Sequence, residues 1–102
     1  MANQLIGSKT ITTAGTQLQF TTLKLRVIRA YFKPNANNSG ANVYIGDSTV
    51  SATNGLSRSD KTTWGDPLEY FPVTVSANEF WGDVDTNGDE IDFMLVLGVA
   101  PK

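Results

Sequence analysis

The sequence predicts an all-β domain, an antiparallel β-sandwich or small barrel of seven or eight short strands. Thr, Ser, Asn and Gly supply 36 of the 102 residues, a bias that favours strands and turns over helices. Polar and apolar residues alternate, and turn signals interrupt the alternation about every 8–12 residues, a spacing typical of sandwiches and barrels. Because no Pro-rich or Gly/Ser-rich linker divides the sequence, residues 1–102 are expected to form a single domain.

The first expected pairing is a hairpin near the N-terminus. Ile11–Thr13 and Leu18–Thr21 are short stretches of strand-forming residues, and Ala14–Thr16 between them contains a turn glycine. The preceding segment, Met1–Gly7, is uncharged and is expected to be a contact arm that lies along a neighbouring molecule.

The next stretch, Leu23–Lys33, fits either a helix or a strand. Leu25, Ile28 and Phe32 fall near helical spacing, and Pro34 would end a helix. The β-branched and aromatic residues, and the lack of an N-cap, favour a strand. One face of that strand would carry Lys24, Arg26, Ile28, Ala30 and Phe32, and the other Leu25, Val27, Arg29, Tyr31 and Lys33.

The middle of the chain is predicted to be rich in turns. Pro34–Asn42 is a loop by composition, and Val43–Ile45 is a short strand. Asp47 can form an Asx turn, and Asn54-Gly55 supplies a turn that needs a positive φ. The polar stretch Ser57–Pro67 is a long connection of the kind that often makes contacts.

The C-terminal third is predicted to hold three strands. Leu68–Val75 should lie at an edge or contain a bulge, because Pro72 cannot donate to a strand ladder. Phe80–Thr86 and Glu90–Val99 are joined through Asn87-Gly88, a strong hairpin signal. The last strand has Ile91, Phe93, Leu95 and Leu97 on one face and Met94 and Val96 on the other. Apolar residues on both faces predict a central strand that is covered on both sides.

Composition excludes several classes of function. The chain has no Cys and no His, which removes disulfides, thiolate or imidazole zinc sites and the usual Ser-His and Cys-His nucleophiles. We therefore expect no enzyme activity and no cofactor. A net charge of −2 and a pI near 4.8 make the chain a poor candidate for binding nucleic acid or anionic membranes. No Sec signal is visible, and the longest apolar run, Phe93–Ala100, is too short to cross a bilayer.

The charge is divided between the two halves of the chain. Residues 1–51 carry five basic side chains and one acidic, whereas residues 52–102 carry three basic and nine acidic. The halves can attract each other, or the corresponding halves of other copies.

The acidic run Asp83–Asp92 resembles the first half of a calcium loop. Asp83, Asp85 and Asn87-Gly88 match that half, but the twelfth position, which should be Glu, is Met94. A solvated acidic hairpin with outward-pointing carboxylates is the preferred interpretation, and no metal site is predicted. Paired carboxylates could also serve a glycosidase, but nothing selects a pair among Asp83, Asp85, Glu69 and Glu79.

Basic and aromatic residues are the remaining candidates. Lys24, Arg26, Arg29 and Lys33, with Tyr31 and Phe32, could bind single-stranded nucleic acid, although pairing with a neighbouring subunit's carboxylates is preferred. Trp64 is either tucked under its loop or offered to a partner, and with Tyr70 it could stack on a sugar. The residues expected to contact a partner are Arg26, Arg29, Arg58, Lys61, Trp64 and Tyr70.

Two blocks resemble small structural proteins of tailed bacteriophages: VYIGDSTVSATNG at Val43–Gly55 and VDTNGDEIDF at Val84–Phe93. The likeness is to the capsid decoration, or cement, type. It implies a β-sandwich or jelly-roll protein that binds the major capsid protein on the virion surface, after assembly in the host cytoplasm, and that has no catalytic residues. The charged insert Arg58–Asp66 departs from that pattern.

The sequence thus leads to a non-enzymatic capsid decoration subunit that bridges major capsid protein subunits and also contacts other copies of itself. The alternative is a glycan- or receptor-binding module of a phage tail or fibre that uses Trp64 and Tyr70. A nucleic-acid-binding barrel that uses Arg26 and Arg29 ranks last.

Overall fold

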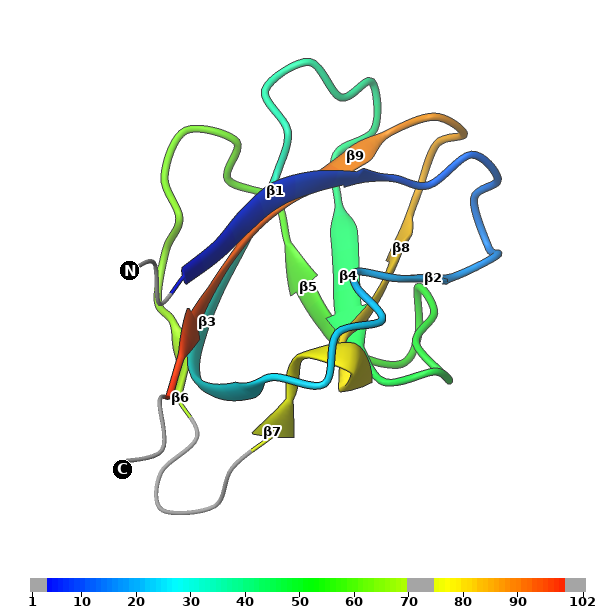
Figure 1. Cartoon of the computed structure of the whole chain (residues 1–102). Helices are drawn as coiled ribbons and strands as arrows, with labels where there is room; N and C mark the ends of the chain where they lie inside the picture. Colours follow the sequence, from blue (N-terminus) through cyan, green and yellow to red (C-terminus); the bar gives the residue numbers. More distant parts are fainter. Residues whose placement is uncertain (1–3, 70–74, 99–102) are drawn as a thin grey trace.

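The computed structural model describes residues 4–69 and 75–98 of the chain. They form two antiparallel sheets packed face to face (Figure 1). The strands are β1 (Gln4–Thr10), β2 (Leu18–Gln19), β3 (Arg26–Pro34), β4 (Val43–Gly46), β5 (Leu56–Arg58), β6 (Leu68–Glu69), β7 (Val75–Ser76), β8 (Trp81–Val84) and β9 (Glu90–Leu97), with one 3-10 turn, η1 (Ala77–Glu79). The predicted all-β class is confirmed.

The strand order is that of a jelly roll. The first sheet has the order β1-β9-β3-β6, with β7 also on the free edge of β3, and the second has the order β2-β8-β4-β5. The pairings are nested: β4 with β5, β3 with β6 and β7, β2 with β8, and β1 with β9. Pairing of β3 with β9 and of β4 with β8 rolls this ribbon into two sheets. Because β6 and β7 share one edge of β3, the strands occupy eight positions.

Four phenylalanines form the centre of the core between the sheets. The ring of Phe32, on β3, lies 5.1 Å from the ring of Phe20 and 5.5 Å from that of Phe80. Phe93 on β9 completes the group, 5.2 Å from Phe20. Buried aliphatic residues from both sheets surround them: Ile11, Val27, Val43, Ile45, Val84, Ile91 and Leu95.

The first strand lies earlier than predicted. β1 is Gln4–Thr10, and residues 11–17 form the connection from the first sheet to the second, so the predicted strand at Ile11–Thr13 is wrong. Hydrogen bonds to the β8–β9 connection hold this segment: Ile11 donates its N–H to the Asp89 carbonyl at 2.9 Å. Gln4–Gly7, expected in a contact arm, pair with β9 of the same chain, and Met1–Asn3 lie outside the described residues.

A β-bulge in β3 explains a second difference. The strand interpretation of Leu23–Lys33 is confirmed over Arg26–Lys33, but Val27 shares the buried face with Ala30 and Phe32 instead of lying opposite them. The register with β9 shifts between Val27 and Arg29. The extra residue of a bulge moves the following side chains to the other face.

Both predicted hairpin turns reverse the chain without joining paired strands. Gly15 and Gly88 have positive φ values of 89° and 85°, as the turns require. Gly15 nevertheless lies between β1 and β2, and Gly88 between β8 and β9, which belong to different sheets. The Asx turn at Asp47 is confirmed, since Asp47 accepts the Thr49 N–H at 2.8 Å.

Candidate protein-binding surface

The side of the first sheet that points away from the second is called here the outer face. The pairings align Ile6, Met94 and Tyr31 in one row across β1, β9 and β3. Their neighbours along each strand point into the core, so these three point outward. Ile6 is 60% exposed, and Met94 and Tyr31 are half-buried. An apolar row therefore crosses the middle of the outer face.

A polar row flanks this apolar row on one side, and a row with polar ends flanks it on the other. On one side, Ser8, Asp92 and Lys33 lie side by side across the same three strands. On the other side, Val96 of β9 lies between Gln4 and Arg29. An apolar strip with a polar rim is the usual composition of a protein-binding surface.

Asp92 fixes the geometry of the first polar row. Its carboxylate accepts hydrogen bonds from the Ser8 hydroxyl at 2.6 Å, the Lys33 ammonium at 2.7 Å and the Asn35 side-chain amide at 3.0 Å. Burial raises the pKa of Asp92, but hydrogen bonds from Lys33, Ser8 and Asn35 and the charge of Lys33 outweigh it, so the pKa lies below its usual value. The row is a prearranged, charged border.

The pKa of Asp92 leads to a pH-dependence prediction. Because the folded-state pKa lies below the unfolded value of 3.8, the carboxylate stabilises the fold above about pH 4, and this contribution disappears as the pH falls through the folded-state pKa. Asp92→Asn is expected to lower the free energy of unfolding at neutral pH and to flatten its decline in acid. Urea unfolding from pH 7 downward measures both effects; a decline as steep as that of the wild type would contradict the assignment.

Trp64 borders the outer face and is half-buried. The Lys33 ammonium lies 5.4 Å from the centre of its ring, close enough for a cation–π contact. The indole therefore stands beside the polar row, held by a residue of that row. It is neither fully tucked under its loop nor fully offered to solvent.

Arg58 and Lys61 are engaged in holding the loop that joins β5 to β6. Arg58 donates from Nη2 to the Asp66 carbonyl at 2.7 Å, and Lys61 donates from Nζ to the Asn38 carbonyl at 2.8 Å. In the same loop, the N–H and hydroxyl of Thr62 and the hydroxyl of Thr63 lower the pKa of Asp60 to about 2. A cavity of about 200 Å³ lies beneath the loop.

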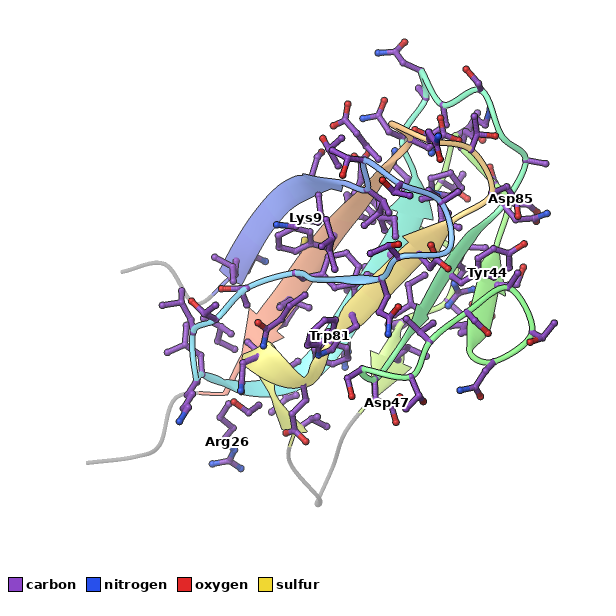
Figure 2. The ribbon with its side chains drawn as sticks, turned by 90° about the vertical axis from the view of Figure 1, so that its right-hand side faces the viewer. Lys9, Arg26, Tyr44, Asp47, Trp81 and Asp85 are labelled. Atoms are coloured by element: carbon purple, nitrogen blue, oxygen red, sulfur yellow. The ribbon has the colours of Figure 1, made fainter. Side chains whose placement is uncertain are left out.

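The other predicted contact residues are dispersed. Arg29 lies on the outer face, with its backbone opposite Glu69 of β6. Arg26 is exposed at one end of the molecule (Figure 2), and Tyr70 lies outside the described residues. The structure thus brings Arg29 and Trp64 to the outer face but does not gather the six residues into one site.

The sequence interpretation missed the apolar row. It placed Met94 and Val96 on a strand covered on both faces. β9 is central, as predicted, and its inner face is buried, but Met94 and Val96 on its outer face are only half-buried. The signal that could have revealed the apolar row is the alternation along β9 of Met94 and Val96 with Phe93 and Leu95, which are buried.

The second sheet has no comparable open face. The connection from β1 to β2 crosses it, where the Gly15 N–H binds Asp83 at 2.9 Å, so that Asp83 is only 1% exposed. The Gln17 side chain also binds the Ser48 carbonyl, which joins this connection to the loop after β4. The outer face of the first sheet is therefore the better candidate for a docking surface.

The acidic run is only in part the outward-pointing hairpin that the sequence predicts: Asp85 is exposed and Asp92 lies on the outer face, but Asp83 and Asp89 are buried. Asp89 is 5% exposed and accepts the N–H groups of Ser39 at 2.9 Å and Gly40 at 2.8 Å. Asp85 accepts the Tyr44 hydroxyl at 2.6 Å, which raises the pKa of Tyr44 (Figure 2). These carboxylates are buried or engaged because they satisfy N–H and O–H donors of adjacent loops and strands.

The described residues contain no group of three or more His, Cys, Asp or Glu side chains placed to hold a metal ion. They also contain no helix that is long and apolar enough to cross a membrane.

No protein-family model, no curated protein and no solved structure matches the chain.

Proposed function

We propose that the protein is a non-enzymatic structural subunit of a bacteriophage virion, a capsid decoration protein that binds the major capsid protein through the outer face of the first sheet. The observation that carries the proposal is the apolar row of Ile6, Met94 and Tyr31, which has a polar row on one side and a row with polar ends on the other. The resemblance of Val43–Gly55 and Val84–Phe93 to phage decoration proteins supplies the partner.

The surface suits repeated, individually modest contacts. Burying a large aliphatic side chain contributes about 1.5–3 kcal/mol, and Ile6 is 60% exposed in the single chain. Ile6 together with the half-buried Met94 and Tyr31 gives moderate affinity, while the polar side chains on either side keep the free protein soluble. Bound in many copies to a closed shell, the subunits would bridge neighbouring capsid proteins and gain strength from their number.

A glycan-binding role has less support. It would need the Trp64 ring to stack on a sugar, and the Lys33 ammonium already lies 5.4 Å from the ring centre. A nucleic-acid platform on β3 is disfavoured as well, because Lys33 binds Asp92 at 2.7 Å and Phe32 is buried in the core.

A single charge in the apolar row tests the proposal. Met94→Glu places a carboxylate between Ile6 and Tyr31, where capsid binding would bury it, and is expected to weaken binding to particles stripped of the protein by roughly 30-fold, equivalent to about 2 kcal/mol. Co-sedimentation with stripped particles measures the affinity.

The matched control is Ala52→Glu, which adds the same charge at an exposed position in the loop after β4. It is expected to bind like the wild type. Equal affinities for the two variants, or no binding of the wild-type protein to stripped heads, would contradict the proposed role of the outer face.

A further inference from the structure

Within residues 4–69 and 75–98, three of the four sheet edges are short, and one is long. The second sheet ends in β2, with two residues, and β5, with three; the far edge of the first sheet is divided between β6 and β7, with two residues each. β1, at the remaining edge, is a continuous strand of seven residues. Natural proteins shorten or interrupt edge strands to prevent pairing with other chains, and β1 lacks that protection.

The hydrogen-bond pattern shows which backbone groups β1 leaves open. Glu90 of β9 directs both backbone groups toward the β3 side: its carbonyl accepts the Asn35 N–H at 3.1 Å, and its N–H binds the Asn38 side chain at 2.8 Å. Bonding residues alternate along an antiparallel strand, so Ile91, Phe93 and Leu95 bond to Lys9, Gly7 and Leu5. The N–H and C=O groups of Gln4, Ile6, Ser8 and Thr10 therefore point away from the sheet.

We propose that β1 pairs antiparallel with β1 of a second copy of this chain, around a two-fold axis at Ile6. In this register Ile6 lies opposite Ile6 of the second copy, and Gln4 lies opposite Ser8 of the second copy. All three residues have outward-pointing backbone groups, so each opposing pair can exchange two hydrogen bonds. The two first sheets become one continuous sheet.

The apolar row supports both a second copy of the chain as the partner and the register centred on Ile6. Ile6 has the largest exposed fraction, 60%, of the large hydrophobic residues in the described part of the chain, and it lies at the open edge. Pairing at Ile6 covers it with its own counterpart. It also joins the two rows of Ile6, Met94 and Tyr31 into one strip across the dimer, which places a self-complementary surface on the two-fold axis.

Charge also favours a centre at Ile6. Lys9 is the only charged residue of β1, and with the axis at Ile6 the two Lys9 residues lie about 20 Å apart along the paired strands, from a rise of about 3.3 Å per residue. Screening removes most repulsion at that distance. An axis at Ser8 would place the two Lys9 residues about 7 Å apart, so their repulsion disfavours that register.

A pairing of one strand with one strand buries little surface, so the free dimer should be weak and depend on concentration. Analytical ultracentrifugation of the wild-type protein up to roughly 1 mM is expected to show a shift from 11.0 kDa toward twice that mass. Dimerisation through β1 is independent of capsid binding, which is tested separately with Met94→Glu.

Ser8→Pro tests the backbone pairing. Proline removes an N–H that points away from β9, so the ladder to β9 remains, but the open edge loses a donor and gains a bulky ring. We expect the dissociation constant to rise at least tenfold. Ser8→Ala is the matched control: it also removes the hydroxyl bond to Asp92 but keeps the N–H, and it should dimerise like the wild type. Circular dichroism verifies that both variants are folded.

Single cysteines test the register, since the chain has none of its own. Ile6→Cys places two thiols across the axis with Cα atoms about 5.5 Å apart, within disulfide range, and should cross-link under mild oxidation. Thr10→Cys lies four residues from the axis, so its two thiols are about 26 Å apart and should not. A monomer at the highest concentration, unchanged dimerisation of Ser8→Pro, or equal cross-linking of both cysteine variants would overturn the proposal.

Discussion

Asp89→Ala is expected to lower the free energy of unfolding by about 3 kcal/mol or more. The Asp89 carboxylate is 5% exposed and accepts the N–H groups of Ser39 and Gly40. A hydrogen bond to a charged group contributes about 1.5–3 kcal/mol, and a buried donor left without a partner costs a comparable amount. Alanine removes the acceptor for both donors, so the loop between β3 and β4 loses two of the hydrogen bonds that attach it to this region, while those of Asn35 and Asn38 with Glu90 remain.

Chemical denaturation at neutral pH measures this loss. The control is Asp66→Ala, which removes an exposed carboxylate that makes no side-chain hydrogen bond with another described residue, and it should change stability by less than about 0.5 kcal/mol. If the two alanine variants were equally stable, the carboxylate of Asp89 would not be an anchor of the fold.

Phe32→Ala is expected to have the other large effect, a loss of about 3–5 kcal/mol. Phe32 has no exposed surface, and its ring lies between those of Phe20 and Phe80. Because Phe32 belongs to the first sheet and Phe20 and Phe80 flank the second, removing its ring leaves a cavity at the contact between the sheets. For a domain of this size, that loss is a large part of the total stability.

The measurement is again chemical denaturation, with Phe32→Leu as the comparison. Leucine fills much of the space and is expected to cost less than half as much as alanine. Exchange of buried amide protons on β3 and β9 should speed up in Phe32→Ala. A cost below about 1 kcal/mol for Phe32→Ala would show that the sheets are not held together at this ring.

Local patterns predicted the two longest strands well. β3 and β9 were expected close to their observed positions, because long runs of β-branched and aromatic residues mark strands regardless of the fold around them. The bulge after Val27 has no comparable local signal, because the register shift is defined relative to β9, more than 60 positions later.

The two turn predictions show what residues that are close in the sequence cannot determine. Gly15 and Gly88 supply the positive φ that a sharp turn needs, but a turn does not determine whether the strands on either side pair. Here the partners of each strand come from distant parts of the chain: β1 pairs with β9, and β2 with β8. Both turns therefore became connections between sheets.

The predictions for the acidic run and for the contact residues were incomplete for the same reason, because both depend on residues that lie far away in the sequence. Asp89 looks solvated in the sequence because its donors, Ser39 and Gly40, lie about 50 positions away. The apolar row depends on the register of three strands, so Ile6, Tyr31 and Met94 could not be associated from the sequence alone. Part of the attraction expected between the basic and acidic halves is used within the chain, where Lys33 of the first half binds Asp92 of the second at 2.7 Å.

Electron cryomicroscopy of an intact phage particle, which gives the position and orientation of the chain, tests whether the outer face binds the major capsid protein. We expect many copies on the outside of the head, with the row of Ile6, Met94 and Tyr31 against the major capsid protein. Copies found only at the tail, or copies on the head whose outer face points to solvent, would contradict it.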